Sequence, residues 1–471
     1  MKIVIIGAGI SGCAAYLEMH KHLPKPSGPE ANYEIIIYEA YSTELNVTAE
    51  ERQRTQEDNT HSSTLLVGGG LGIGANGLNV LRRLDEDLLK DVVRSGYVVS
   101  TFNMKNRNGW SLVSIDATGH TPSEKQQMHM VAASRHSLWQ ALRSRVPDEH
   151  IINKRISEVV ARADGKNLIH FVDGSPSVEA DLVIGADGVR SMTKRAIFPD
   201  AKEDPYPPNY EGLVGVGGFI PSADVKGLVQ KGSMNFIFGG NGFFGYFFSE
   251  SALSASNRDS PYHVSEPGDL LAWWSTYEIE ECPDRKTLDM ADVTRQLRER
   301  HSHWKDPVIQ KIIQSLKVES MYPTWTVPPL PSWERDGVVL VGDAAHALPP
   351  SSGQGTSQAL EDVEAFVLLL SHHLRKNGQK EERMTDAAWK TIIKTAASQY
   401  MAMRKPRVTE ILKHAQHSQG KKRDMGLIQE YSMYTALKIM GLFPGIMSGQ
   451  LHKVIDYNIA EEVAKITVSD P

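Results

Sequence analysis

The sequence predicts an α/β protein in which a parallel-sheet domain carries an inserted antiparallel sheet and is followed by helices. Three observations support this expectation. Buried-strand runs lead into glycine-rich turns at 3–12, 179–191 and 336–355. Two apolar runs flank a turn signal within 234–248, and the pattern becomes largely helical from residue 376 onward.

Composition excludes several classes of protein. The chain has 471 residues, 41% hydrophobic and 23% charged, which is ordinary for a globular enzyme. A net charge of −6 provides no basic field for nucleic acid. Two cysteines, Cys13 and Cys282, exclude a disulfide framework and indicate a reducing, cytoplasmic location. No apolar run reaches the roughly 18 to 20 residues of a membrane-spanning helix, so no transmembrane segment is expected.

The N-terminal segment "KIVIIGAGISGCAAYLEM" has the context of a dinucleotide-binding fingerprint. A buried strand precedes Gly7, Gly9 and Gly12, and a helical pattern follows. The first glycine permits a tight turn, the second lets backbone approach a pyrophosphate, and the third allows close helix packing. The next predicted strand ends at Glu39, an acid suited to a ribose hydroxyl. This arrangement predicts a Rossmann-like domain that binds FAD or NAD.

Two later motifs favour FAD. They are the D-G motif in "EADLVIGADGVRS" (179–191) and the G-D motif in "DGVVLVGDAAHALPPSSGQGTSQALEDVEAF" (336–366), where P-x-x-G-Q-G precedes a helix expected near Thr356. Together with the fingerprint and "ASRHSLWQAL" (133–142), they resemble the flavoprotein monooxygenases of the aromatic-hydroxylase type. That family includes salicylate hydroxylase and fungal secondary-metabolite hydroxylases and epoxidases. The resemblance covers most of residues 1–370.

The resemblance implies roles for individual residues. Asp343 would bind a ribityl hydroxyl, Arg135 would lie near the flavin linkage, and Pro349 would line the flavin face. The G-Q-G turn and the following helix N-terminus would point N–H groups at the pyrimidine edge, where a dipole stabilises reduced flavin. Asp187 would lie near the flavin and the NADPH approach, with Arg190 supporting either, although a structural ion pair between them is the alternative. The expected cofactor-binding residues are Gly7, Gly9, Gly12, Glu39, Arg135, Asp187, Gly188, Arg190, Gly342, Asp343, Gly353, Gly355 and Thr356, and the expected catalytic positions are Pro349, Gly353 and Gly355.

A second glycine-rich match, "GIGANG" at 72–77, raises the alternative of a separate NADPH site. The next strand-like run, "GYVVSTFNM", lacks the acid that a ribose would need. We therefore interpret Gly72, Gly74 and Asn76 as backbone of the flavin domain. NADPH is expected to bind only transiently, as a co-substrate without a Rossmann domain of its own. The polar stretch 42–63 departs from the family pattern. Either Arg52 or Arg54 within it could be the family's flavin-contacting arginine.

The segment between the D-G and G-D motifs is predicted to form the substrate-binding sheet. Asn241-Gly242 marks a hairpin, and "LLAWWSTYE" (270–278) reads as another strand. In the family, such a sheet covers the flavin ring and forms the substrate pocket. The candidates, expected to act only as a group, are Phe236, Phe238, Phe244, Tyr246 and Trp273. The alternative for each is ordinary packing. The predicted domains are 1–205 with 320–375 for FAD, 206–319 for substrate, and a helical segment 376–471.

The Met-rich segment "GLIQEYSMYTALKIMGLFPGIM" is expected to dock across the two domains rather than on a membrane surface. His414 and His417 lack a third ligand, so no metal is predicted. His346 in "GDAAH" is expected to form a structural hydrogen bond. The oligomeric state is left at monomer or homodimer.

The resemblance implies an FAD-dependent monooxygenase that uses NAD(P)H and O2 through a C4a-hydroperoxyflavin. The substrate would be an electron-rich aromatic or polycyclic small molecule, hydroxylated or epoxidised, as in secondary metabolism. A Baeyer–Villiger-like insertion is less favoured. The alternatives are a flavin reductase or oxidase without oxygen transfer, and a non-catalytic binding protein of the GDP-dissociation-inhibitor type. A flavin halogenase is disfavoured because "TWTVPP" has one Trp where W-x-W-x-I-P needs two.

Overall fold

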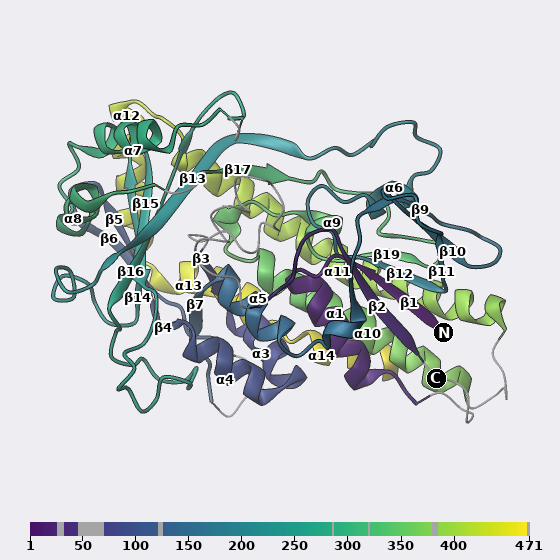
Figure 1. Cartoon of the computed structure of the whole chain (residues 1–471). Helices are drawn as coiled ribbons and strands as arrows, with labels where there is room; N and C mark the ends of the chain where they lie inside the picture. The colour runs from purple at the N-terminus through teal and green to yellow at the C-terminus, as the bar shows by residue number, and fades with distance from the viewer. Residues whose placement is uncertain are drawn as a thin grey trace.

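Figure 1 shows the computed structural model of the chain. The residues that it describes are 1–25, 33–45, 70–120, 126–284, 287–318, 321–378 and 385–468. Arg52 and Arg54, the two candidates for a flavin-contacting arginine, lie outside these ranges.

A six-stranded, mostly parallel sheet carries the N-terminal fingerprint. Its order is β18-β19-β12-β1-β2-β8, and only the β18–β19 pair is antiparallel. In that order the strands are Glu334–Arg335, Val338–Leu340, Leu182–Gly185, Lys2–Ile6, Glu34–Glu39 and Ile151–Asn153. Helix α1 (Ile10–His22) connects β1 to β2 and packs beside α10 (Gly355–Gly378). The carboxyl ends of β1, β12 and β19 therefore bring the three glycine-rich turns to one edge, as the mixed α/β prediction required.

The "GIGANG" segment lies in a different kind of structure. Strand β3 (Gly70–Ile73) pairs antiparallel with β7 (Met130–Ser134), which also pairs antiparallel with β4 (Tyr97–Val99). Helix α3 (Ala75–Leu84) follows β3 and packs on α10 and on α4 (Glu86–Arg94). Because β3 has no parallel partner among the described strands, this segment is not a second βαβ nucleotide fold.

The aromatic segment lies in a seven-stranded sheet with the order β17-β13-β16-β15-β14-β5-β6. Its strands, in that order, are Met321–Thr326, Asn209–Pro221, Leu270–Glu278, Gly242–Phe248, Ser233–Gly239, Thr101–Asn106 and Ser111–Asp116. All neighbours are antiparallel except β14 and β5, which are parallel. The sheet is therefore mixed, whereas an antiparallel sheet was expected. Strands β5, β6 and β17 come from outside 206–319. The division of the chain into domains stays a prediction.

The expected hairpin is present, but its loop is displaced by one residue. Gly239 pairs with Gly242, so the two-residue loop is Gly240-Asn241 rather than Asn241-Gly242. Gly242 takes φ +131° as the first residue of β15. Tertiary contacts hold Asn241, because its Oδ1 accepts from Trp304 Nε1 at 2.9 Å and its carbonyl accepts from Arg300 at 2.9 Å.

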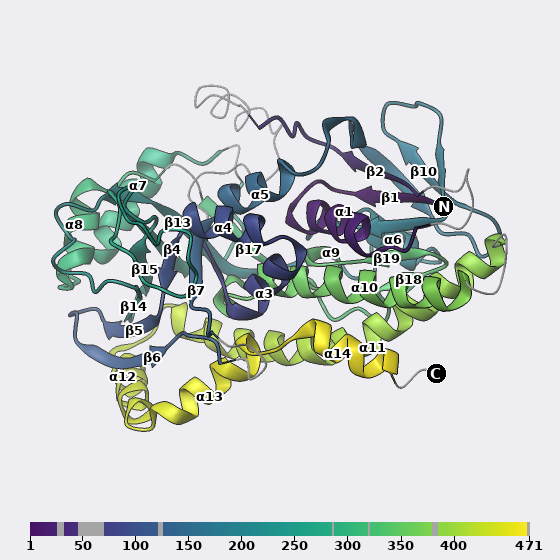
Figure 2. The ribbon, with the colours of Figure 1, turned by 90° about the horizontal axis from the view of Figure 1, so that it is seen from below.

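The C-terminal helices run from the edge of the seven-stranded sheet to α10 (Figure 2). Helix α12 (Leu427–Gly441) packs on β6, α13 (Pro444–Ile455) contacts β6 and α3, and α14 (Ile459–Val468) packs on α10. The outer surface of α12, α13 and the link between them exposes apolar side chains: Leu427, Ile428, Tyr431, Ile439, Met440, Leu442, Phe443 and Ile446. No helix within the described ranges is long and apolar enough to cross a membrane.

Candidate active site

The three fingerprint glycines have different physical roles. Gly7 has φ +102°, and a Cβ there would lie 2.5 Å from the carbonyl oxygen of Ala186. A Cβ on Gly12 would lie 1.8 Å from the Gly7 carbonyl oxygen. By contrast, no atom lies within 4 Å of a Cβ on Gly9. Gly7 and Gly12 therefore serve packing, and Gly9 leaves open space beside the N-terminus of α1.

Glu39 lies against this turn, where the sequence places an acid. Its Oε2 accepts from the Ala8 N–H at 2.6 Å, and its Oε1 accepts from the Tyr41 N–H at 3.0 Å. Burial raises the pKa of the Glu39 carboxyl, and the backbone hydrogen bonds act in the opposite direction. The carboxylate is therefore fixed beside the glycine turn.

Helix α5 (Arg135–Arg143) also reaches the turn. Ser134 caps the helix by accepting from the Ser137 N–H at 2.9 Å, and Arg135 is exposed at its first residue. The buried Trp139 Nε1 donates to the Ala8 carbonyl at 2.8 Å. Sequence reasoning missed Trp139, although it lies four residues after Arg135, one helical turn away on the same face.

The D-G motif is held by its own loop. The Asp187 carboxylate accepts from Ser191 Oγ at 2.6 Å, from the Met192 N–H at 2.8 Å and from the Thr193 N–H at 3.0 Å. Burial raises the pKa of Asp187, and these hydrogen bonds lower it. Gly188 takes φ +75° with open space around it. Asp187 therefore stabilises the turn before α6 (Thr193–Ile197).

Arg190 does not form the ion pair with Asp187 that was the alternative interpretation. Its exposed guanidinium lies over the Trp325 ring, 5.3 Å from the ring centre. Within the described residues, the partners of Asp187 are the hydroxyl and amide groups of its own loop.

The G-D motif approaches the fingerprint directly. Gly342 takes φ +59°, and a Cβ there would lie 2.6 Å from Ser11 Oγ. Asp343 is exposed, although the following residue, Ala344, is buried. An open carboxylate next to the first turn of α1 leaves room for a polyol hydroxyl, and the predicted role of Asp343 stays a prediction.

The G-Q-G turn is the second open region. Gly353 takes φ +59°, and no atom lies within 4 Å of a Cβ on Gly353 or Gly355. Helix α10 begins at Gly355, so the N–H groups of Gly355 and Thr356 belong to its unsatisfied first turn. Pro349 is buried at the start of this turn, and its carbonyl accepts from the Ser352 N–H at 2.9 Å. The open glycines and the helix N-terminus fit an electron-rich ring edge.

A buried charge network, which sequence reasoning missed, lies behind these turns. Arg404, on α11 (Asp386–Gln419), is fully buried and ion-paired with Glu361 and Asp362 of α10; its Nε lies 2.8 Å from Asp362 Oδ1. Asp362 Oδ2 also accepts from the Gly342 N–H at 3.0 Å and lies 2.5 Å from His346 Nε2. The structural hydrogen bond expected for His346 is thereby confirmed.

The network extends to "GIGANG" and to the C-terminus. Asn76 Nδ2 donates to Glu361 at 2.6 Å and to Gln354, within the G-Q-G turn, at 3.0 Å. Arg407 donates to Glu361 at 2.9 Å and to the Val454 carbonyl at 2.7 Å. These contacts join four parts of the chain behind the G-Q-G turn.

Charge pairing decides the ionisation of the two acids. Burial alone would raise the pKa values of Glu361 and Asp362. Arg404 and Arg407 lower the pKa of Glu361, and His346 and Arg404 lower that of Asp362, so that both pKa values lie below their ordinary values.

The predicted aromatic group is divided between two faces of its sheet, so it does not form one pocket. Phe244, Tyr246 and Trp273 share one face and are at most 2% exposed. On this face Phe244 packs against His301 of α7 (Met290–His301) and against Trp304, which precedes α8 (Pro307–Ser315). The opposite face carries Phe236 and Phe238 together with Phe243, Phe247 and Trp274.

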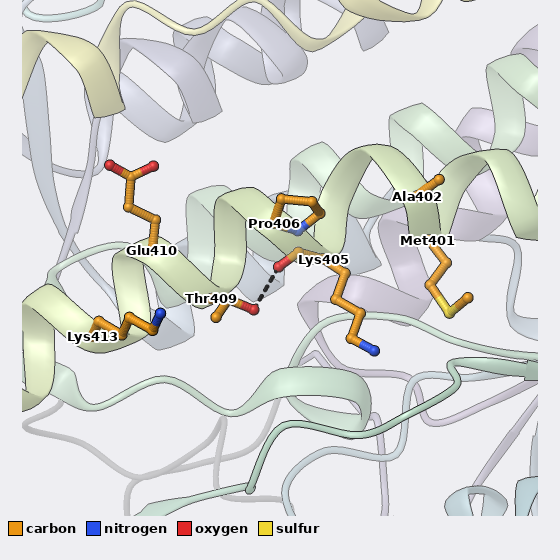
Figure 3. Close-up of a pocket in the computed structure, with 7 residues that line it drawn as sticks. All are labelled: Met401, Ala402, Lys405, Pro406, Thr409, Glu410 and Lys413. Atoms are coloured by element: carbon orange, nitrogen blue, oxygen red, sulfur yellow. Dashed lines mark hydrogen bonds between the residues drawn. The ribbon is translucent and has the colours of Figure 1, made fainter.

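A separate surface groove lies along α11 (Figure 3). It is lined by Met401, Ala402, Lys405, Pro406, Thr409, Glu410 and Lys413. Pro406 lies inside the helix, and Thr409 Oγ1 donates to the Lys405 carbonyl at 2.7 Å. None of the predicted site residues lines this groove, so we do not assign the chemistry to it. His414 is exposed on the same helix, and the described residues contain no group of three potential metal ligands.

Comparisons with known proteins show what this chain is similar to. The FAD binding domain family matches residues 273–411. The 6-hydroxynicotinate 3-monooxygenase of Pseudomonas fluorescens is 23% identical over 77% of this chain and 80% of its own length. The 3-amino-4-hydroxybenzoate 2-monooxygenase of Streptomyces cremeus is 25% identical over 74% and 76%. Zeaxanthin epoxidase of Prunus armeniaca is 24% identical over 80% of this chain and 50% of its own length.

The chain thus carries a match to the FAD binding domain family and is similar to monooxygenases and to an epoxidase. Two solved structures share the fold of this chain. Klebsiella pneumoniae HpxO complexed with FAD and uric acid has a TM-score of 0.68 at 19% identity, covering 97% of this chain and 96% of that chain. A salicylate hydroxylase substrate complex has a TM-score of 0.68 at 17% identity, covering 98% and 97%.

Proposed function

We propose that this chain is an FAD-dependent monooxygenase that binds FAD across the three turns and uses NAD(P)H and O2 to hydroxylate or epoxidise an electron-rich aromatic or polycyclic small molecule. The observation that carries the proposal is the open backbone at Gly9, Gly353 and Gly355 beside the first turns of α1 and α10. When bound, FAD supplies the electron transfer and oxygen activation that protein side chains lack.

The chain's own residues would then bind and orient. Gly9 would let the α1 N-terminus approach the pyrophosphate, and Glu39 and Asp343 would accept from ribose and ribityl hydroxyls. Gly353 and the first turn of α10 would donate to the pyrimidine edge, where negative charge develops on reduction. The aromatic face of β14–β16 would hold the substrate and exclude water. A reducing compartment such as the cytoplasm would suit the free thiols of Cys13 and Cys282.

The test combines cofactor analysis with a labelled oxidant. Purified protein is denatured and the released flavin identified, and the holoenzyme is then mixed anaerobically with NADPH or NADH across a panel of aromatic compounds. A compound that accelerates flavin bleaching is incubated under ¹⁸O₂. One labelled oxygen atom in the product supports the proposal. Flavin reduction with unlabelled product indicates a reductase or oxidase, and protein without flavin indicates a binding protein.

A further inference from the structure

One lysine beside the aromatic sheet stands apart from the other charges in its surroundings. Lys422 ends the short helix η4 (Gly420–Lys422), which joins α11 to α12 and contacts β14, β15 and β16. Its Nζ lies 4.5 Å from the centre of the Phe243 ring. Burial lowers the pKa of this ammonium to about 8.

The acids on the surrounding elements already have arginine partners. Glu278 ends β16, Asp424 follows η4, and Glu430 lies on α12 with its carboxylate beside Gly240. Their ion pairs are Arg423–Glu278 at 2.5 Å, Arg300–Asp424 at 2.6 Å and Arg107–Glu430 at 3.1 Å. Within the described residues, no carboxylate forms an ion pair with Lys422.

Lys422 lies at the end of a row of aromatic rings. Phe243 packs on Trp274 with ring centres 5.8 Å apart, and Trp274 packs on Phe247 at 5.8 Å and on Phe236 at 5.9 Å. These four side chains share the sheet face opposite α7 and α8. Phe236 and Trp274 are partly exposed, unlike the fully packed aromatics of the other face.

The same row reaches the segments that precede the predicted flavin turn. A Cβ on Gly70 of β3 would lie 3.0 Å from the Phe247 ring. Strand β3 leads to Asn76, which donates to Gln354 in the G-Q-G turn. The ring row therefore extends from an ammonium without an acid partner to the chain segments beside the proposed flavin site.

We propose that Lys422 binds the carboxylate of a planar aromatic acid whose ring lies against Phe236 and Trp274. The inference rests on the proposed function, because it assigns the chemical class of that enzyme's substrate. An ammonium over an aromatic ring and away from acids loses hydration without gaining an ion pair, and a substrate carboxylate supplies the missing partner. Lys422 would determine substrate specificity through its positive charge, without transferring a proton.

The test compares aromatic acids with their carboxamides, which keep the ring and remove the charge. The probes are benzoate, 2-hydroxybenzoate and 1-hydroxy-2-naphthoate, each with its amide. Their dissociation constants for the FAD holoenzyme are measured by calorimetry at about pH 7. We expect at least one acid to bind about tenfold or more tightly than its amide. Lys422→Met should bind the acid about 10- to 100-fold more weakly than the parent protein does, and its affinity for the amide should stay within about twofold of the parent value. Lys422→Arg should restore most of the lost affinity for the acid.

The matched control is Lys413→Met, which removes an exposed lysine of α11. This variant should leave all six affinities unchanged. A pH series from about 6.5 to 9.5 adds a second readout, because the carboxylate stays ionised throughout. Acid binding should weaken as the pH rises through the Lys422 pKa, and Lys422→Arg should remove this dependence. The neighbouring arginines stay charged in this range, and burial holds the pKa of Tyr434 above it.

The inference is wrong if no acid binds more tightly than its amide, or if Lys422→Met binds the acid as tightly as the parent protein. If Lys422→Met lost affinity for the acid and for the amide to the same extent, the aromatic face would be damaged and no specific charge interaction would have been lost. That result would also overturn the inference. Flavin content and reduction by NADPH are measured in the same preparations. Protein without flavin refutes the proposed function, whereas flavin-loaded, reducible protein without acid preference refutes only the role of Lys422.

Discussion

Replacing Gly9 by alanine separates the packing role of the fingerprint from its cofactor role. Gly9 has φ −74° and ψ −168°, an extended conformation that alanine adopts freely. Because no atom lies within 4 Å of the new Cβ, the substitution has no steric cost in the chain itself. A Gly→Ala change at a compatible site stabilises a protein by about 0.4–1 kcal/mol through the unfolded state. The free energy of unfolding of the apoprotein should therefore stay unchanged or rise by this amount.

Binding of FAD should change in the opposite direction. The methyl group would stand where the pyrophosphate approaches the α1 N-terminus, and the loss of one hydrogen bond to a charged group costs roughly 1.5–3 kcal/mol. At 1.4 kcal/mol per tenfold, the dissociation constant for FAD should rise about 10- to 100-fold. The assay titrates FAD into apoprotein and follows flavin fluorescence, and urea unfolding of the same apoprotein reports the stability.

Two further glycines serve as controls. Gly227→Ala adds a methyl group to an equally open but exposed turn, so it should leave the FAD affinity unchanged and affect the stability no more than Gly9→Ala does. Gly12→Ala places its Cβ 1.8 Å from the Gly7 carbonyl and should prevent stable folding. Unchanged FAD affinity in Gly9→Ala would refute our assignment of the open space. A loss of more than about 1 kcal/mol in apoprotein stability would refute the statement that this space is free.

Three other predictions concern the groups behind and beside the turns. Arg404→Met leaves two buried carboxylates without one of their cationic partners and should lower the free energy of unfolding in urea by about 3–5 kcal/mol. Arg404→Lys should recover part of this loss. An unchanged free energy of unfolding in Arg404→Met would contradict the role of the network. Glu361 and Asp362 have depressed pKa values in the folded chain, so their contribution is present above about pH 4.5 and is lost as the pH falls through the folded values. Stability measured from pH 6 down to 3 should thus fall less in Arg404→Met than in the parent protein. Trp139→Phe removes the donor to the Ala8 carbonyl and should weaken FAD binding by up to about tenfold in the same fluorescence titration, whereas an unchanged affinity would show that the bond does not shape the turn.

The glycine turns were predictable because backbone geometry restricts them to particular residues. Gly7, Gly342 and Gly353 all take positive φ, which few other residues adopt at low cost. The position of Glu39 at the end of β2 likewise follows from the βαβ connection, and the structure brings it to Ala8. Here local rules and the fold require the same residues.

The error in the aromatic group was avoidable from the sequence. In a hairpin with any two-residue loop, the numbers of directly paired residues add to an odd value, so even-numbered residues on one strand share a face with odd-numbered residues on the other. Phe236 and Phe244 must therefore point to opposite faces, whether the loop is 240–241 or 241–242. The sequence does not show which face packs on α7, because Phe244 meets His301 and Trp304, which lie more than 50 residues later in the chain.

The Arg404 network has no local signature, because its two acids lie on α10 and its two arginines on α11, so that only the tertiary packing of these helices brings the charges together. Its consequence is that the C-terminal helices supply part of the structure behind the three turns. Arg407 joins the Val454 carbonyl to Glu361, and Arg404 joins α11 to Asp362, which holds the Gly342 N–H. The backbone of the G-D motif thus depends on charges supplied some 60 residues later in the chain. A chain ending before α11 would leave Glu361 and Asp362 buried without their cations, so we expect the segment from 386 onward to be required for a stable flavin site.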